Sequence, residues 1–402
     1  AAAKEEDRAT LLSFKNQVSD PLSTLGTWNT SSGVDSCHWH GVNCSSSGRI
    51  TGLDLHSNNL TTIGNQQLCS SNSSLESLLL QNNRLDGEHN VFASLQRCAR
   101  LKMLDVSFNT LAGELPSSLC ENHPQLRHLI LWANSFEGQI PSALAKCKNL
   151  VNLMLSFNRF EGEVPSQLSD LQDLQWLSLS NNRLSGEIPA ALGRLHRMTI
   201  LQLRDNRLQG EIPSELEQCA SLKMLDVSFN TLAGELPSSL CENHPQLRHL
   251  ILWANSFEGQ IPSALAKCKN LVNLMLSFNR FEGEVPSQLS DLQDLQWLSL
   301  SNNRLSGEIP AALGRLHRMT ILQLRDNRLQ GEIPSELEHP IYLDVSNNNL
   351  TGEIPLELGR MEDLIVLGLA YNSLTGEIPT GFGTIPTLDT VDMSHNLLQG
   401  GI

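Results

Sequence analysis

The chain repeats a set of aromatic, imidazole and guanidinium side chains whose chemistry suits the binding of another molecule. They stand two, four or six residues before a regularly spaced asparagine and alternate with leucines. Tryptophan and arginine are enriched at binding hot spots, and a guanidinium suits a carboxylate or a sulfate group. The sequence therefore predicts a ligand-binding surface formed by His128, Trp132, Trp176, Arg204, Trp253, Trp297, Arg325 and Tyr342.

Two alternatives remain open for these side chains. Asp205 and Asp326 directly follow Arg204 and Arg325, so a local ion pair competes with a ligand for each guanidinium. A tryptophan at such a position also has a structural use, since it can cover the aliphatic part of a neighbouring side chain.

No motif in the chain points to catalysis. The sequence has no G-x-S-x-G, no H-E-x-x-H and no phosphate-binding glycine loop, and no cysteine and histidine cluster has zinc spacing. We therefore expect no enzyme activity, no catalytic residue, no metal and no cofactor. Acidic residues outnumber basic ones by 43 to 28, giving a net charge of −15, and no basic run occurs, which argues against a nucleic-acid partner.

The elements that position these side chains follow from one pattern, L-x-x-L-x-L-x-x-N-x-L-x-G-x-I-P. It is the pattern of a leucine-rich repeat, and a period this regular predicts a solenoid. Its asparagine falls at fifteen positions: 58, 83, 109, 134, 158, 182, 206, 230, 255, 279, 303, 327, 348, 372 and 396.

The chemistry of the pattern predicts the fold class. The leucines of L-x-L point inward from a short strand and the intervening residue points outward. The asparagine amide can bond backbone groups inside the turn. We predict an α/β-type solenoid, a leucine-rich-repeat superhelix with a parallel β-sheet on its concave face.

The first fifty residues differ from the repeats and predict an N-terminal cap. Residues 4–18 read as an amphipathic helix that ends before Asp20 and Pro21, and would cover the apolar core of the first repeat. Cys37 and Cys44 are well placed for a local disulfide. The predicted organisation is a cap at 1–50 and about fifteen repeats at 51–402.

A block of the repeats is duplicated. Residues 101–217 recur without a change as residues 222–338, and the spacing of asparagines shortens at the end of the second copy, so that an irregular junction is expected near 338–342. A very recent natural duplication and deliberate block duplication in an engineered repeat scaffold both account for this identity.

The N-terminal sequence carries a family resemblance. D-R-A-T-L-L-S-F-K-N-Q-V-S-D-P-L-S-T-L-G-T-W-N, followed by C-H-W-H-G-V-N-C, resembles the cap of plant leucine-rich-repeat receptor kinases and receptor-like proteins. Repeats such as L-S-N-N-R-L-S-G-E-I-P resemble the same group, and residues 171–189 are similar to brassinosteroid-receptor-type ectodomains. The non-repeat island of those steroid receptors is missing here, which argues against a steroid ligand.

The resemblance implies the extracellular part of a plasma-membrane receptor. Such a domain binds a peptide or another small extracellular ligand and recruits a co-receptor that is itself a leucine-rich-repeat ectodomain. In these receptors the last repeats contact the co-receptor, which makes Tyr371 and His395 the candidates. The alternatives are a secreted inhibitor of a cell-wall hydrolase, similar to polygalacturonase-inhibiting proteins but with more repeats, and the engineered scaffold.

Modification sites favour a secreted protein. N-x-S/T sequons occur at Asn29, Asn43, Asn59, Asn72 and Asn349. Nine cysteines also fit an oxidising compartment. Cys69 with Cys98, Cys120 with Cys147 and Cys241 with Cys268 are placed to bridge adjacent repeats, and buried thiols are the alternative; Cys219 is left over. No apolar stretch is long enough for a bilayer, so membrane attachment would need a segment outside this sequence.

Overall fold

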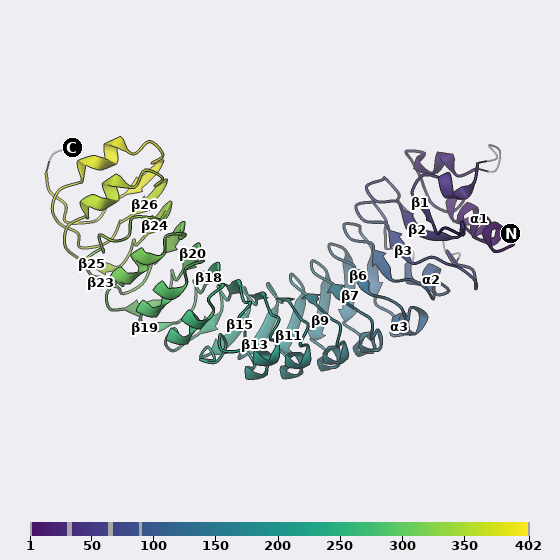
Figure 1. Cartoon of the computed structure of the whole chain (residues 1–402), viewed down its shortest axis with the longest axis horizontal. Coiled ribbons are helices and arrows are strands. Elements are labelled where there is room, and N and C mark those ends of the chain that lie inside the picture. The colour runs from purple at the N-terminus through teal and green to yellow at the C-terminus, as the bar shows by residue number, and fades with distance from the viewer. Residues whose placement is uncertain (1, 30–33, 63–66, 88–90, 401–402) are drawn as a thin grey trace. The chain divides into compact units, whose positions relative to one another are not determined.

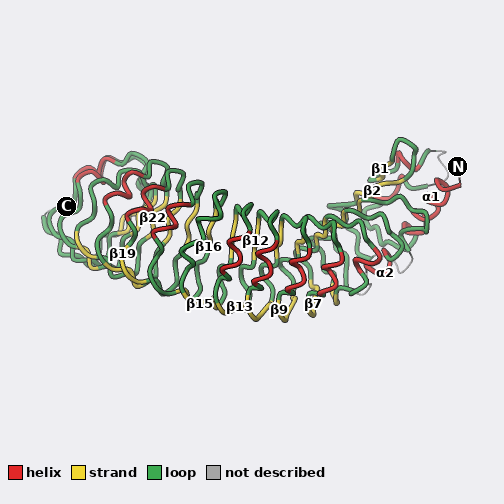
Figure 2. The backbone as a smooth tube through the Cα atoms, turned by 60° about the horizontal axis from the view of Figure 1, so that its bottom comes forward, coloured by secondary structure: helices red, strands yellow, loops and turns green. Residues whose placement is uncertain are grey.

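The structure is a computed structural model that describes residues 2–29, 34–62, 67–87 and 91–400. It divides into two compact units, Ala1–Arg207 and Leu208–Ile402. In each unit the short strands that open successive repeats lie side by side, and the helices of the repeats form a separate row (Figures 1 and 2). The predicted solenoid of leucine-rich repeats with a parallel sheet is confirmed in each unit.

The N-terminal unit begins with a helix that covers the first repeat. Helix α1 (Ala2–Lys15) ends three residues before the predicted end, although the Val18 N–H still donates to the Phe14 carbonyl at 3.1 Å. Leu11 and Phe14 are buried. Trp28 stacks on Trp39 with ring centroids 5.8 Å apart, which supplies apolar bulk beneath the helix.

The main sheet of the N-terminal unit is parallel apart from its antiparallel β1–β2 pair. Its strands follow one another in chain order: β1 (Val42–Cys44), β2 (Ile50–Asp54), β3 (Ser77–Leu79), β4 (Met103–Asp105), β6 (His128–Ile130), β8 (Asn152–Met154), β10 (Trp176–Ser178) and β12 (Ile200–Gln202). The predicted boundary between cap and repeats, at residues 50 and 51, lies inside β2. That boundary stays a prediction.

The other elements of this unit close each repeat away from the main sheet. A second row of strands contains β5 (Ala112–Glu114), β7 (Ser135–Gln139), β9 (Arg159–Glu163), β11 (Arg183–Glu187) and β13 (Arg207–Gly210), of which β13 begins at the unit's last residue. The helices are α2 (Val91–Leu95) and α3 (Leu119–Asn122), with the 3₁₀ helices η1 (Thr24–Thr27), η2 (Ser36–His38), η3 (Ser142–Lys146), η4 (Ser166–Asp170) and η5 (Ala190–Arg194).

The C-terminal unit repeats this plan. Its main sheet is parallel and runs β14 (Met224–Asp226), β16 (His249–Ile251), β18 (Asn273–Met275), β20 (Trp297–Ser299), β22 (Ile321–Gln323), β24 (Tyr342–Asp344), β26 (Val366–Gly368) and β27 (Thr390–Asp392). The shorter strands are β15 (Thr231–Gly234), β17 (Ser256–Phe257), β19 (Glu282–Glu284), β21 (Arg304–Ser306), β23 (Gln330–Gly331) and β25 (Asn349–Leu350). The 3₁₀ helices are η6 (Ser214–Gln218), η7 (Ser263–Lys267), η8 (Ser287–Asp291), η9 (Ala311–Arg315), η10 (Leu356–Arg360) and η11 (Thr380–Thr384).

The asparagine of the repeat joins neighbouring repeats, as predicted. Asn158 donates to the carbonyls of Leu131, Leu155 and Ser156 at 3.0 to 3.2 Å and accepts from the Phe136 N–H at 3.0 Å. Buried backbone groups that the turn would leave unpaired are thus satisfied. The glycine of the repeat pattern is also required. Gly186, four residues after Asn182, has φ of +77°, and an added Cβ would lie 2.9 Å from Cγ of Glu163 in the preceding repeat.

Disulfides join cysteines of adjacent segments. The structure contains the pairs Cys37–Cys44, Cys69–Cys98, Cys120–Cys147 and Cys241–Cys268. The last three connect the outer segments of neighbouring repeats, so the structure takes the bridged alternative for them. Cys219 is buried and takes part in none of the four.

Candidate ligand-binding surface

We define the strand face as the side of the main sheet that carries the residues six, four and two positions before each repeat asparagine. The predicted ligand-binding residues lie on it in both units. His128, Trp176, Trp297 and Tyr342 are the first residues of β6, β10, β20 and β24 and are half-buried. Trp132, Arg204, Trp253 and Arg325 come two residues after the ends of their strands, where the chain turns.

The first cluster on this face, which we call the first aromatic patch, consists of Phe108, Trp132 and Phe157. The ring of Trp132 lies 5.3 Å from that of Phe108 and 5.9 Å from that of Phe157. All three remain open to solvent, with exposed fractions of 52%, 37% and 49% for Phe108, Trp132 and Phe157. Exposed aromatic side chains in contact with one another are a feature of interaction sites.

The second aromatic patch is the copy of the first and consists of Phe229, Trp253 and Phe278. Trp253 lies 4.7 Å from Phe229, in an edge-on arrangement, and 6.4 Å from Phe278. Phe229 and Phe278 are exposed and Trp253 is half-buried. Both patches lie wholly inside one unit each.

The phenylalanines were missed at the sequence level because they do not follow the alternation of the strand. Each directly precedes a repeat asparagine and has a positive φ, between 52° and 56° for Phe108, Phe157, Phe229 and Phe278. A left-handed backbone conformation breaks this alternation, so the phenylalanine side chain points to the strand face. There it meets the tryptophan of the neighbouring repeat, which stands one position earlier in that repeat. The recurring sequence S-F-N was the available signal.

Trp176 and Trp297 are held by hydrogen bonds. The Trp176 indole N–H donates to Oε1 of Gln202 at 3.0 Å, and the Ser178 hydroxyl donates to the same oxygen at 3.0 Å. The copy repeats both bonds from Trp297 and Ser299 to Gln323. These networks fix the orientation of the two rings.

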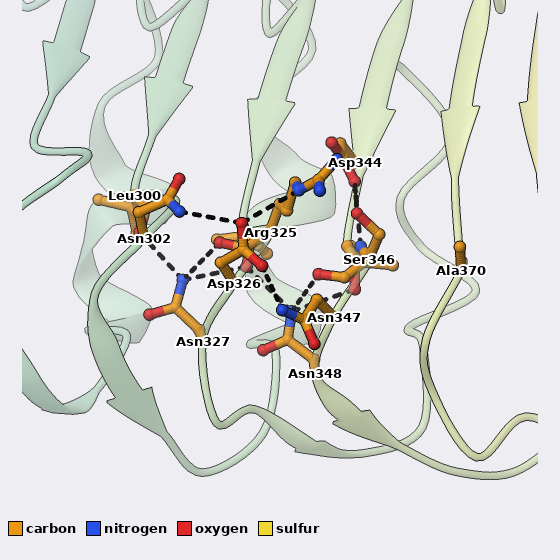
Figure 3. Close-up of polar contacts among 12 residues, drawn as sticks. Leu300, Asn302, Arg325, Asp326, Asn327, Asp344, Ser346, Asn347, Asn348 and Ala370 are labelled. Atoms are coloured by element: carbon orange, nitrogen blue, oxygen red, sulfur yellow. Dashed lines mark hydrogen bonds and ion pairs between the residues drawn. The ribbon is translucent and has the colours of Figure 1, made fainter. Parts of the chain in front are cut away.

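Arg325 lies in a polar cluster in which the local ion pair is present (Figure 3). Its Nε is 3.1 Å from Oδ2 of Asp326. Asn302 also donates to Oδ2 of Asp326, at 2.9 Å, and Asn347 donates to Oδ1. Figure 3 shows the guanidinium extending toward Asp344. The cluster thus holds two carboxylates against one guanidinium.

These contacts shift the titration of the pair. The hydrogen bond and the charge of Asp326 raise the pKa of Arg325. For Asp326, burial alone would raise the pKa, but the hydrogen bonds from Asn347 and Arg325 outweigh it and hold the pKa below its usual value. Arg325 is therefore engaged by the protein itself, through its contact with Asp326.

Burial also acts on two histidines of the strand face. It lowers the pKa of His128, with a further lowering from the charge of Arg127. In the copy, burial and the charge of Arg248 lower the pKa of His249. Both rings therefore present a neutral imidazole to the strand face at neutral pH.

The two candidate co-receptor residues meet in the structure. The rings of Tyr371 and His395 stack with centroids 4.1 Å apart and an interplanar angle of 9°. Tyr371 is 54% exposed. Like the phenylalanines, both directly precede a repeat asparagine and have positive φ.

No group of three or more histidine, cysteine, aspartate or glutamate side chains among the described residues is arranged to hold a metal ion. In the same part of the chain, the helices lack the combined length and apolar character that crossing a membrane requires.

Family comparisons agree with the repeat pattern. A family described as "Leucine-rich repeat region" matches residues 83–333, "Leucine rich repeat N-terminal domain" matches residues 4–45, and "Leucine Rich Repeat" matches residues 341–361. The chain belongs to the leucine-rich-repeat family. The cap of this leucine-rich-repeat chain is of the kind found in plant receptors, and the predicted resemblance is confirmed.

Its curated relatives are receptor kinases of Arabidopsis thaliana. The chain is 36% identical over 160 residues to "Receptor-like protein kinase BRI1-like 3", and 38% identical over 146 residues to "MDIS1-interacting receptor like kinase 1". The matched regions are 34% and 36% of this chain, but only 14% and 13% of those proteins. The chain thus matches only a small part of the length of these curated relatives.

Solved structures give the same answer for the fold. The Arabidopsis receptor kinase HAESA ectodomain, in complex with an IDA peptide hormone that is lengthened at its N-terminus, matches with a TM-score of 0.89 and 33% identity. The match covers 99% of this chain and 66% of that one. PEPR1 with AtPEP1 matches with a TM-score of 0.85 and 32% identity, over 99% and 59% of the two chains. A further HAESA structure contains both IDA and the co-receptor SERK1.

Proposed function

We propose that the chain is the extracellular ligand-recognition part of a plant plasma-membrane receptor, and that it binds an extended peptide along the strand face. The observation that carries the proposal is the run of exposed aromatic and polar side chains on that face, on a fold whose solved relatives hold peptides. Parallel strands at regular spacing offer a long surface that suits an extended ligand.

The division of roles follows from the contacts. The aromatic patches supply apolar contact, Trp176 and Trp297 supply oriented rings, and Arg204 and Arg325 supply donors for a carboxylate or a sulfate group. His128, Trp132, Trp253 and Tyr342 complete the proposed ligand surface. None of these roles needs covalent chemistry, so the proposed function is recognition rather than catalysis.

The test uses the whole chain secreted from plant or insect cells and immobilised on a biosensor. The probes are a library of short linear peptides displayed on phage, together with the IDA and AtPEP1 peptides of the two solved neighbours. We expect saturable binding of at least one peptide, weakened about tenfold or more by Trp176→Ala or Trp297→Ala. The control is Leu356→Ala, which removes an exposed apolar side chain from η10, outside the main sheet. Absence of any saturable peptide binding would refute the proposal.

We also propose that the stacked Tyr371 and His395 contact a co-receptor ectodomain. The pair presents a flat aromatic surface of the type enriched at protein interfaces. The ectodomain of SERK1, the co-receptor bound to HAESA, is the probe. With peptide bound, Tyr371→Ala should lower SERK1 affinity and leave peptide affinity unchanged; a fall in peptide affinity instead would assign the pair to the ligand site.

The five sequons complete the proposal as glycosylation sites. Asn43, Asn72 and Asn349 are exposed, and Asn29 and Asn59 are half-buried. Ser31, which completes the sequon at Asn29, lies outside the described residues. Mass spectrometry of the secreted chain before and after glycosidase treatment reads out which of them are occupied.

A further inference from the structure

We infer that Gln323 is a further ligand-binding residue of the strand face, and that its side-chain nitrogen donates a hydrogen bond to a main-chain carbonyl of the bound peptide. This inference rests on the proposed function and deepens it, since it names one contact and the class of ligand atom that makes it. Gln323, the last residue of β22, is absent from the set of ligand-binding residues that the sequence predicts.

The orientation of the Gln323 amide follows from the chemistry of its two partners on β20. The Trp297 indole N–H donates to Oε1 of Gln323 at 3.1 Å, and the Ser299 hydroxyl donates to the same oxygen at 2.8 Å. An indole N–H can only donate, so the amide atom that it meets has to be the oxygen and not the nitrogen. The position of Nε2 is therefore determined as well.

A serine of the preceding repeat holds this arrangement in place. The hydroxyls of Ser277 and Ser299 lie 2.6 Å apart. Because Ser299 uses its hydrogen for Gln323, Ser277 is the donor to Ser299, and one chain of hydrogen bonds crosses three adjacent repeats. Both serines are buried, whereas Gln323 is half-buried. The amide is thus oriented by buried groups before any ligand binds, which lowers the entropic cost of binding.

The nitrogen of this amide is available. Among the described residues, the side-chain hydrogen bonds of Gln323 are the two that Oε1 accepts. Nε2 is not one of the buried polar atoms that lack a partner, so it reaches solvent. It carries two N–H donors on the strand face. Trp297 on one side and Arg325, two residues later, are both proposed ligand residues, so the donor lies within the proposed ligand surface.

The geometry of an extended peptide makes a main-chain carbonyl the acceptor to which we commit. The solved neighbours hold peptides, and an extended peptide carries one carbonyl for each residue, about 3.3 Å apart along the chain. A peptide that lies across β22 therefore brings a carbonyl within reach of Gln323 whatever its sequence, whereas a side-chain acceptor is present in some peptides only. Main-chain contacts of this kind supply affinity, and the aromatic rings nearby supply selectivity.

The first experiment compares two matched glutamine-to-glutamate variants of the whole secreted chain. A short linear peptide is selected from a displayed library on the wild-type chain, synthesised and titrated by calorimetry. Gln323→Glu keeps an oxygen for Trp297 and Ser299 but replaces the donor by a second oxygen, so we expect the affinity to fall about tenfold or more. Gln330→Glu makes the same change at an exposed position of β23, outside the main sheet, and should leave the affinity unchanged. Equal affinities for the two variants would overturn the inference.

A second readout separates the lost donor from a displaced Trp297. Tryptophan labelled with ¹⁵N gives one indole signal for each of the six tryptophans, and Trp297→Phe identifies the signal of Trp297. In Gln323→Glu the indole N–H should still exchange slowly with solvent, while the affinity for the peptide falls. In Gln323→Leu both the slow exchange and the affinity should be lost. If Gln323→Glu loses affinity together with the slow exchange, Gln323 only orients Trp297 and the donor assignment is wrong.

Esters identify the acceptor on the ligand. Each peptide bond of the selected peptide is replaced in turn by an ester, whose carbonyl accepts a hydrogen bond more weakly. At one position the ester should weaken binding to the wild-type chain about threefold or more, and have a smaller effect on binding to Gln323→Glu. If no ester behaves in this way, the acceptor is not a main-chain carbonyl and the inference is overturned, although peptide recognition stands. A failure of every peptide to bind would refute the proposed function itself and the inference with it.

Discussion

At the scale of single residues, the repeat asparagine has the clearest energetic role. Asn158 is 9% exposed and makes four hydrogen bonds to backbone groups of its own and the preceding repeat. Asn158→Ala leaves several buried donors and acceptors unpaired, so we expect a loss of about 3 kcal/mol in the free energy of unfolding, measured by urea denaturation. Asn149→Ala, which removes one exposed hydrogen bond to the Pro124 carbonyl, should cost less than about 0.5 kcal/mol. Equal losses would contradict this role.

The buried His123 makes stability depend on pH. Burial lowers its pKa, and the hydrogen bond to the Cys98 carbonyl only partly opposes this. Below the ordinary value of 6.5 the unfolded chain therefore binds the proton more readily than the folded chain does. We expect the contribution of His123 to the free energy of unfolding to be complete above that pH. It should be lost as the pH falls through the pKa that His123 has in the folded chain. Urea denaturation of the His123→Gln variant from pH 5 to pH 8 should show a weaker acid dependence than the wild type; an unchanged slope would exclude this histidine as its source.

At the scale of elements, the outer segments of the repeats depend on cross-links. The Cys120–Cys147 disulfide connects α3 to the end of η3 and closes a loop with a sequence separation of 27 residues. Replacing both cysteines by serine should lower the free energy of unfolding by about 3 kcal/mol, because the unfolded chain gains freedom. Cys219→Ala, which removes a buried thiol but no cross-link, is the control. The larger loss should appear only under oxidising conditions.

The strands and the positions of the proposed ligand residues on them were predictable because both follow from the spacing of leucine and asparagine. The inward leucines and the outward Trp132 and Trp176 obey the period-2 rule of a strand. The phenylalanines of the patches and the stacking of Tyr371 on His395 were not predicted, because they depend on a left-handed turn residue that breaks that period. The polar cluster at Arg325 depends on Asn347 and Asp344, which belong to the next repeat, and sequence spacing alone does not show which atoms meet.

At the scale of the whole molecule, a repeat protein should tolerate removal of a complete block, because each repeat contacts mainly its neighbours. Deleting residues 101–221 joins Arg100 to Leu222 and restores the local sequence that already follows Arg100. The shortened chain keeps the cap, the Cys241–Cys268 disulfide and the second aromatic patch.

We expect this deletion variant to be secreted and folded, and to unfold in urea with a slope reduced by about 30%, in proportion to the surface lost. It should still bind a peptide recognised by the intact chain, since the rings of the second aromatic patch are all retained. A folded deletion variant that binds no peptide would show that binding requires residues 101–221. A variant that fails to fold would show that the block contributes more than contacts between neighbouring repeats. Circular dichroism and calorimetry on the same preparation distinguish the two results.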